Sequence, residues 1–501
     1  MDPANYSSLY SGAPGTFFAF TVDPIPTVTS QPQTALIKFD INERKAMPFA
    51  SGVRFAAISS DGQKALLLTG QSWNMVSTAA PPAPGQGTLN LASMTMKVNP
   101  RDEWKQMYHE AWRIERDFFY APNFHGQDLG KLEKRYEPFL DGLMSRSDLN
   151  YLFTDMLGEI SVGHMFINGG DMPAVRHVPI GLLGADYSLE NGRYRFSRVY
   201  NGENWNPDLQ APLTQPGVNV VAGEYLLEVD GKNITSEDNV NEALEATAGR
   251  QVRLKVGPNA NGKGSREVVV VPISDEFGLR NKAWEEDNRR KVEEMSGGRL
   301  GYVHIPDTNV GGWTNFNRYY YAQTGKEGMI IDERFNHGGQ VDDYMVSQMA
   351  RPLMSYWTPR HGKDITSPLA NVFGPKVMII NQYSGSGGDY FPWVFRQYKL
   401  GPIVGHRTWG GLVGILVFPS FIDGGGVTAP NIAFRQLDGK FGIENVGVAP
   451  DIAVDLDPYL WRQGRDAQLE AAVQEGMKLL EKVPKRPYVP PVYPDRSKIG
   501  G

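Results

Sequence analysis

Short apolar segments alternate with helical patterns from about residue 299 onward. Such alternation predicts a largely parallel sheet that is covered by helices. A final helix is expected to begin at Asp457, with an apolar face, and the proline-rich tail after Pro484 is expected to be extended. The expected strands are 300–305, 329–332, 377–380 and 403–404, and the expected helices between them include 341–353 and 390–398.

The N-terminal part has different patterns. Residues 1–78 predict short strands, and Asp61-Gly62 is a tight-turn signal between two of them. A polar linker rich in proline and glycine follows at 79–88. Beyond Asn99, which can cap a helix, apolar residues recur at helical spacing. The candidate strands are 16–20, 35–39 and 65–68, and a second helix is expected over 148–157.

Residues 176–275 change character again. A strand and turn at 225–232, a short helix at 238–248 and closing strands at 252–256 and 268–271 are expected. This order resembles a PDZ domain of the type found within processing peptidases. The resemblance implies that a peptide terminus is bound at a sheet edge. A small β-domain that only spaces its neighbours is the alternative.

Composition narrows the class of protein. The net charge of −6, from 50 basic and 56 acidic residues, argues against general nucleic-acid binding. The absence of cysteine excludes disulfides, thiolate catalysis and cysteine-ligated zinc. No apolar run approaches the roughly 20 residues of a membrane span. The first residues lack the features of a signal peptide, which favours the cytoplasm, or the periplasm if the sequence is truncated.

One segment carries the strongest chemical signal. The apolar run at 377–380 leads into Ser384-Gly385-Ser386-Gly387-Gly388, and an aromatic-rich helical pattern follows. A strand-to-helix turn of this kind can expose a serine hydroxyl beside backbone N–H groups, as acyl transfer requires. A plain glycine-rich turn in an α/β sheet is the alternative. Three further segments, 331–339, 161–164 and 441–451, bear on the same chemistry.

These segments, their order and residues 407–411 together resemble the tricorn protease family, which belongs with the C-terminal processing serine peptidases. The similarity covers about residues 90–484, and the preceding segment resembles the last part of the family's β-propeller region. The implied fold is multidomain α/β plus β, with a ClpP/crotonase-like core. The implied domains are a partial propeller-like segment and linker (1–88), a helical subdomain carrying the catalytic histidine (89–175), a PDZ-like domain (176–275), the α/β peptidase core (276–484) and an extended tail (485–501).

The resemblance assigns roles to individual residues. The family pattern makes Ser386, not Ser384, the nucleophile. The oxyanion hole maps to the N–H of Gly387 and to that of Gly338 or Gly339. No metal or organic cofactor is implied.

His164 takes the place of the general base, because a Gly-Glu-hydrophobic segment precedes it. Glu444 matches the glutamate that supports this histidine through a preceding serine. That serine position is Gly163 here. Glu444 could therefore reach His164 through water, Ser161 could substitute, or catalysis could be impaired.

Other residues compete for these roles. His337 directly precedes Gly338-Gly339, in the segment 335–339 that we call the glycine loop. There it could transfer protons or only shape the loop. Asp332 and Arg334 are expected to form a structural ion pair, and Glu444 could be a plain surface carboxylate. His304 and His406, at the ends of apolar strands, are expected to be structural. His109 is expected on a helix face and His177 in a loop.

Specificity departs from the family pattern. Trp357 stands where relatives that favour basic residues carry an acidic group, so we expect apolar residues to be favoured. The leading hypothesis is a serine endopeptidase acting on oligopeptides or unfolded chains, in a hexamer by resemblance. The alternatives are an inactive peptide-binding scaffold and, from the shared fold, an acyl-CoA enzyme.

Overall fold

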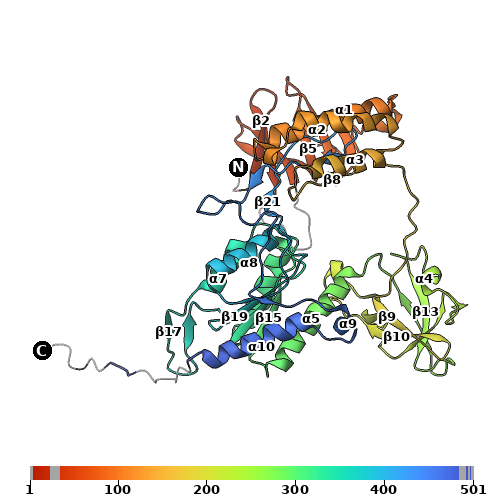
Figure 1. Ribbon diagram of the computed structural model, residues 1–501. Coiled ribbons are helices and arrows are strands. Elements are labelled where there is room, and N and C mark those ends of the chain that lie inside the picture. Colours follow the sequence, from red (N-terminus) through yellow and green to blue (C-terminus); the bar gives the residue numbers. More distant parts are fainter. Residues whose placement is uncertain (1–3, 23–33, 485–491, 495–496, 498–501) are drawn as a thin grey trace. The chain divides into compact units, whose positions relative to one another are not determined.

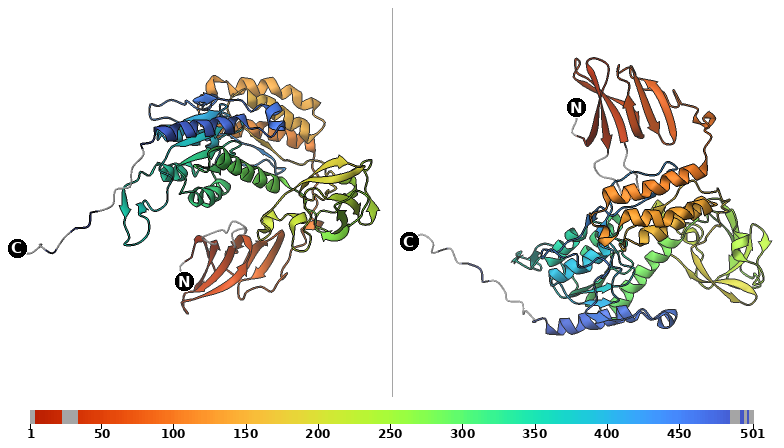
Figure 2. Two further views of the ribbon diagram at one scale, coloured as in Figure 1. Left: turned by 90° about the horizontal axis from the view of Figure 1, so that it is seen from below. Right: turned by 45° about the horizontal axis from the view of Figure 1, so that its top comes forward.

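The structure is a computed structural model that describes residues 4–22, 34–484, 492–494 and 497. The chain divides into two compact units (Figures 1 and 2). Unit 1 comprises residues 1–98 with 203–210, and unit 2 comprises 99–202 with 211–501. Most of the predicted extended tail, 485–501, lies outside the described residues.

Unit 1 is built from two antiparallel sheets, which confirms the β-rich prediction. The first sheet has the order β1-β2-β3-β4, and the second has the order β5-β6-β7. The apolar side chains of both sheets, including Phe18, Leu36 and Leu67, form one small core. The strands are β1 (Tyr6–Ser11), β2 (Thr16–Val22), β3 (Thr34–Asp40), β4 (Lys45–Ser51), β5 (Val53–Ile58), β6 (Lys64–Thr69) and β7 (Ser72–Ser77).

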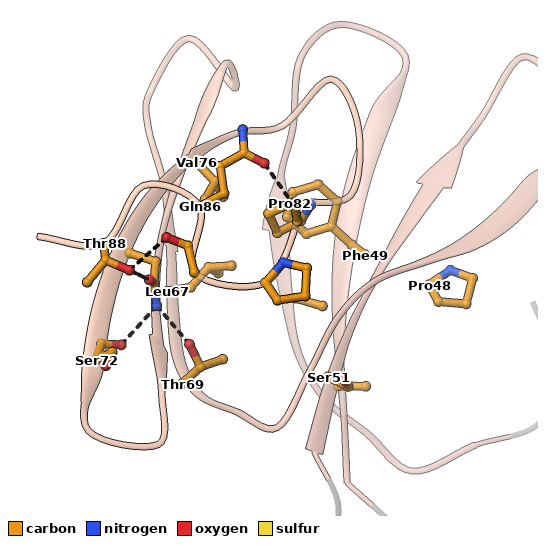
Figure 3. A pocket seen from close by; sticks show the side chains of 16 residues that line it. Pro48, Phe49, Ser51, Leu67, Thr69, Ser72, Val76, Pro82, Gln86 and Thr88 are labelled. Atoms are coloured by element: carbon orange, nitrogen blue, oxygen red, sulfur yellow. Dashed lines mark hydrogen bonds between the residues drawn. The ribbon is translucent and has the colours of Figure 1, made fainter.

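The predicted linker at 79–88 is partly wrong, because its end pairs with a strand. Gly87 accepts a hydrogen bond from Met75 N–H (2.8 Å), and Thr88 forms a β-bridge with Asn74. A cavity of about 570 Å³ lies beneath this segment (Figure 3). The Asn74 side chain bonds Thr69, the Ser72 carbonyl and Thr88. The polar wall of the cavity therefore holds the segment in place.

The helical subdomain opens unit 2. Asn99 caps α1 (Pro100–Phe118), accepting from Arg101 N–H, as its position before Pro100 predicts. Helices α2 (Leu129–Tyr136) and α3 (Arg146–Gly158) pack on the apolar face of α1. The chain then reaches β8 (Ile167–Asn168), which pairs with β22 (Gly426–Val427) from the core. This pairing ties residues 159–166 to the distant segment that follows β22.

The PDZ-like region is a sheet of order β14-β13-β11-β10-β9, with β12 paired to β11. The helix predicted over 238–248 is wrong in length. It is reduced to α4 (Val240–Ala243), because Leu244 leaves helical geometry with a φ of −106° and a ψ of 13°. Ala246, with a positive φ of 56°, then prevents the helix from resuming. The strands are β9 (Ala185–Glu190), β10 (Arg193–Val199), β11 (Tyr225–Val229), β12 (Lys232–Asn233), β13 (Val252–Gly257) and β14 (Arg266–Val270).

The core is a five-stranded, fully parallel sheet, as the alternating pattern predicts. Its order is β15 (Leu300–His304), β16 (Gly328–Asp332), β19 (Lys376–Ile380), β20 (Ile403–Gly405) and β24 (Ile452–Ala453). Alternate strand residues pack on opposite faces. One face contacts η6 (Phe316–Tyr320), which directly follows α6 (Val310–Asn315), and also α7 (Asp342–Ala350) and α8 (Gly387–Gln397). The other contacts α5 (Phe277–Met295) and α10 (Ala467–Lys482) (Figure 1).

The helix predicted to begin at Asp457 is two helices. Asp457 caps the five-residue α9 (Pro458–Arg462), and Asp466 caps α10. Gly464, with a φ of 78°, stands between them and breaks the helical path. The apolar face predicted for the last helix belongs to α10.

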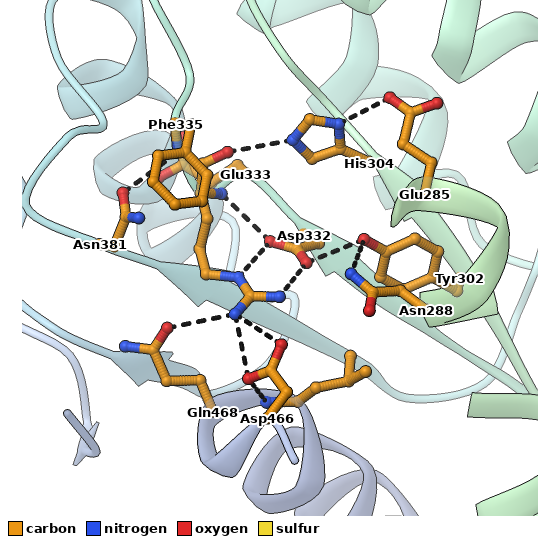
Figure 4. A network of polar contacts seen from close by, with 12 residues as sticks. Glu285, Asn288, Tyr302, His304, Asp332, Glu333, Phe335, Asn381, Asp466 and Gln468 are labelled. Carbon is orange, nitrogen blue, oxygen red and sulfur yellow. Dashed lines mark hydrogen bonds and ion pairs between the residues drawn. The ribbon is translucent and has the colours of Figure 1, made fainter. Parts of the chain in front are cut away.

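A buried polar network fixes the end of β16 (Figure 4). The Arg334 guanidinium pairs with Asp332 (2.7 Å) and Asp466 (2.9 Å), and all three are buried. His304 bonds the Arg334 carbonyl (3.0 Å) with one ring nitrogen and Glu285 on α5 (2.8 Å) with the other. The predicted structural roles of the Asp332–Arg334 pair and of His304 are thus confirmed. In the described part of the chain, no helix is long and apolar enough to cross a membrane.

Candidate active site

Ser386 stands between the last residues after β19 and the first residue of α8. Its φ of 59° and ψ of −116° are unusual for a non-glycine residue, and such strain costs of order 1–3 kcal/mol. It lies in a cleft of about 510 Å³ together with His164. The cleft is lined by His164, Phe166, Asn309, Asn336, His337, Gly339, Gln340, Tyr383, Gly385, Ser386, Trp409, Gly414, Ile415 and Ile432.

The turn at residues 384–388, which we call the serine turn, can pack closely against its neighbours because glycines flank Ser386 on both sides. A Cβ at Gly385 would stand 2.7 Å from the Trp409 ring. A Cβ at Gly387 would stand 2.1 Å from the Thr308 hydroxyl and 2.7 Å from the nitrogen of Gly339. The turn is therefore pressed between the Trp409 indole and the glycine loop that follows β16.

Asp389 anchors the turn, and the sequence analysis missed it. Its carboxylate accepts hydrogen bonds from the backbone N–H groups of Ser386 (3.1 Å), Gly410 (2.8 Å) and Gly411 (3.0 Å), and from the Thr408 hydroxyl. Burial raises the pKa of Asp389, and these four donors oppose the shift. Its spacing offered a signal, because an acidic residue three positions after a serine that precedes a helix is typical of a capping box.

The glycine loop offers one N–H group more readily than the other. Gly338 N–H donates to the Asn336 side-chain oxygen (2.8 Å). In the described part of the chain, no hydrogen bond occupies the N–H of Gly339 or that of Gly387. A Cβ added at Gly387 would stand 2.7 Å from the Gly339 nitrogen, so these two glycines are close neighbours.

His164 reaches the cleft from the loop after α3. Its ring packs between Trp409 (centroids 5.3 Å apart) and Phe166 (5.6 Å), and only 8% of the residue is exposed. Its carbonyl accepts a hydrogen bond from the Thr428 hydroxyl, close to the β8–β22 pairing. Burial lowers the pKa of His164. The imidazole is therefore neutral, and able to accept a proton, at neutral pH.

Glu444 meets the histidine loop directly through the backbone. One carboxylate oxygen accepts the Gly163 N–H (2.6 Å) and the other accepts the Leu412 N–H (2.6 Å). Burial raises the pKa of Glu444, and the two backbone donors oppose this. Ser161 is exposed and makes no hydrogen bond to Glu444 within the described structure. Glu444 thus contacts the residue before His164, and the reading as a plain surface carboxylate is wrong.

Of the other candidate residues from the sequence, only His337 lines the cleft among the described residues. It does so from the glycine loop. His109 pairs with Glu133 on α2, whereas His177 is exposed and His406 is half-buried. Trp357 lies in β17 (Ser355–Trp357), is 71% exposed and does not line the cleft, so its role in specificity stays a prediction. Among the described residues, no cluster of acidic or histidine side chains could hold a metal ion.

Substituting Gly338 with alanine is expected to lower kcat for acyl transfer at Ser386 about 10²-fold or more. Its φ is 84°, and a new Cβ would stand 2.6 Å from the Ser386 Cβ and 2.9 Å from the Gly387 nitrogen. The Gly298→Ala variant is the matched control, since Gly298 has a φ of 80° with open space around it. Steady-state kinetics on both variants checks this. Equal effects on kcat would contradict the account, because backbone strain alone would then explain the loss.

Three family models match the chain. The tricorn protease C1 domain matches residues 100–158, the tricorn protease PDZ domain matches 181–275, and peptidase family S41 matches 299–454. These ranges correspond to the helical subdomain, the PDZ-like sheet and the parallel core with its helices.

Individual proteins agree with the models. Tricorn protease homolog 1 of Streptomyces coelicolor is 34% identical over 471 residues, covering 92% of this chain and 44% of the relative. The tricorn protease of Thermoplasma volcanium is 31% identical, covering 91% and 44%. A crystal structure of the tricorn protease superposes with a TM-score of 0.88 at 26% identity, covering 96% of this chain and 47% of that one. The chain spans about half the length of the curated relatives it matches.

Proposed function

Because the chain belongs to the tricorn protease family, we propose that it is a serine endopeptidase that cleaves oligopeptides or unfolded polypeptides. The observation that carries the proposal is the cleft itself. It brings a strained serine, Ser386, and a buried neutral imidazole, His164, together with the glycine loop, whose Gly339 N–H donates no intramolecular hydrogen bond within the described residues.

The chemistry follows from these groups. The Ser386 hydroxyl attacks the scissile carbonyl, and His164 accepts the hydroxyl proton. The N–H groups of Gly387 and Gly339 stabilise the tetrahedral oxyanion. His164 then passes its proton to the leaving amine, which leaves an acyl-enzyme on Ser386 that water hydrolyses. Gly338 is the weaker oxyanion candidate, because Asn336 already accepts its N–H.

Three residues position this machinery, and one of them, Trp409, also lines the cleft. Asp389 holds the Ser386 N–H and the loop that carries Trp409. Trp409 packs on both Gly385 and the His164 ring. Glu444 fixes the backbone beside His164, in the place of the family's serine relay.

The remaining parts of the proposal concern binding. The PDZ-like sheet has two edge strands, β9 and β14, to which a peptide could add. A homo-oligomer, a hexamer by family resemblance, belongs to the same proposal. Light scattering on the purified chain measures that state directly.

The test is hydrolysis of internally quenched fluorogenic peptides by the purified chain. We expect cleavage within the peptide, with release of two peptide products identified by mass spectrometry. Peptides that differ only in the residue before the cleaved bond measure the predicted preference for apolar over basic residues. Binding of these peptides without hydrolysis across pH 6–9 would instead support the inactive scaffold.

A further inference from the structure

Glu333 is a fully buried carboxyl group directly after β16. It is 0% exposed, and neither carboxyl oxygen has a hydrogen-bond partner among the described residues. Its sequence neighbours Asp332 and Arg334 belong to the network of Figure 4, whereas the Glu333 carboxyl group takes no part in that network. The charged groups that act on it most strongly are three other carboxyl groups, from Asp389 on α8, Asp342 on α7 and Asp332 on β16.

The backbone of Glu333 joins the two loops that form the catalytic site. Its carbonyl accepts hydrogen bonds from the Ser384 hydroxyl (2.9 Å) and from Asn336 N–H (3.2 Å). The Asn336 carbonyl in turn accepts the Gly385 N–H (3.0 Å). Glu333 therefore lies where the serine turn and the glycine loop are held together.

The surroundings of Glu333 disfavour a negative charge. Burial raises the pKa of Glu333 well above its ordinary value, and the nearby carboxyl groups raise it further. The Ser384 hydroxyl opposes this shift only weakly, because its hydrogen bond goes to the Glu333 backbone carbonyl. Ionisation would place an uncompensated charge beside Asp389, which holds the Ser386 N–H. It would also oppose the oxyanion that the neighbouring N–H groups stabilise.

We propose that Glu333 is a positioning residue that supports the serine turn and the glycine loop only while its carboxyl group is uncharged. This role of Glu333 rests on the proposed peptidase function. The consequence is an alkaline limit on catalysis in a folded enzyme, above the range in which His164 titrates.

The experiment compares kcat and KM for peptide hydrolysis from pH 6 to 10 in the wild type, Glu333→Gln and Glu115→Gln. Wild-type kcat is expected to fall roughly tenfold per pH unit above the Glu333 titration. Glu333→Gln cannot ionise, so its ratio of kcat at high pH to kcat at pH 7.5 is expected to exceed the wild-type ratio at least about fivefold.

Glu115 provides the matched control. It is another fully buried glutamate with unpartnered oxygens, but it lies on α1 in the helical subdomain. Burial raises the pKa of Glu115 to about 8, so its ionisation also disfavours the folded state. Glu115→Gln is expected to follow the wild-type kcat profile. Circular dichroism at each pH measures the folded fraction, which separates loss of catalysis from unfolding.

Each outcome decides one of the two claims. No hydrolysis by the folded wild type at pH 7.5 overturns the peptidase function itself. Hydrolysis in which wild type and Glu333→Gln share one alkaline profile overturns the role of Glu333. So does an alkaline fall that Asp342→Asn removes and Glu333→Gln does not, because burial raises the pKa of Asp342 to about 8.

Glu333→Met covers the case in which the glutamine variant does not fold. An apolar side chain of similar size needs no hydrogen-bond partner, and it should also abolish the alkaline fall. If neither variant folds, the dependence of wild-type kcat on pH decides the role of Glu333. A constant kcat up to pH 10 then overturns the proposal, and a fall in a fully folded enzyme supports it.

Discussion

Replacing Ser386 with alanine is expected to lower kcat for peptide hydrolysis by about 10⁵-fold. Alanine removes the attacking oxygen, so no acyl-enzyme can form, and only the N–H groups and the cleft remain to assist water. KM should change little, because the cleft walls are untouched. Steady-state and single-turnover kinetics on fluorogenic peptides measure both constants.

The control for this variant is Ser161→Ala. Ser161 is an exposed serine three residues before His164, and it is the hydroxyl that could have replaced the missing family serine. We expect activity within about twofold of wild type, the usual range for an exposed site. A large loss in Ser161→Ala, or residual activity near wild type in Ser386→Ala, would contradict the assigned nucleophile and relay.

Replacing His164 with glutamine is expected to have a comparable effect, about 10⁵-fold on kcat. Glutamine fills similar space between Trp409 and Phe166 but cannot accept the hydroxyl proton at neutral pH. The wild type adds a second signature. Burial lowers the pKa of His164, so the acid limb of kcat/KM should lie below pH 6.5, with activity lost as the imidazole is protonated.

His337→Gln tests the rival imidazole in the same cleft. His337 is exposed and lines the cleft from the glycine loop. Its replacement should alter kcat by less than about tenfold and leave the acid limb in place. An acid limb that disappears in His337→Gln would transfer the role of general base to that residue.

The sequence predicted the parts of this site better than their assembly. The alternating pattern after residue 299 gave a parallel sheet, and a serine after the third core strand is where such sheets place reactive groups. The match of residues 381–386 to a family pattern separated Ser386 from Ser384. Ser384 is buried and bonds the Glu333 carbonyl, in agreement with that choice.

What sequence could not supply depends on side-chain direction and on pairing over long distances. Asn336 turns its amide oxygen toward Gly338 and not Gly339, and no pattern encodes that choice. The β8–β22 pairing, which brings the His164 loop to the core, joins two-residue strands with no periodicity to detect. The break between α9 and α10 depends on one glycine with a positive φ inside an otherwise helical pattern.

The departure at Gly163 has a physical explanation in the structure. A serine there would place its Cβ 3.1 Å from the Glu444 carboxylate and 3.1 Å from the Gly411 Cα, so the glycine leaves Glu444 free to approach the backbone. The carboxylate then bonds the Gly163 N–H itself. Position 163 thus keeps the glutamate beside the histidine loop without a hydroxyl between them.

Reaction with a fluorophosphonate probe, followed by peptide mapping, tests the central claim most directly, since the probe phosphonylates only a serine activated by a base. The account predicts one adduct, on Ser386, that forms in the wild type at neutral pH and is lost in Ser386→Ala and strongly slowed in His164→Gln. An adduct on another residue, or hydrolysis of peptides by a chain that the probe leaves unlabelled, would contradict it.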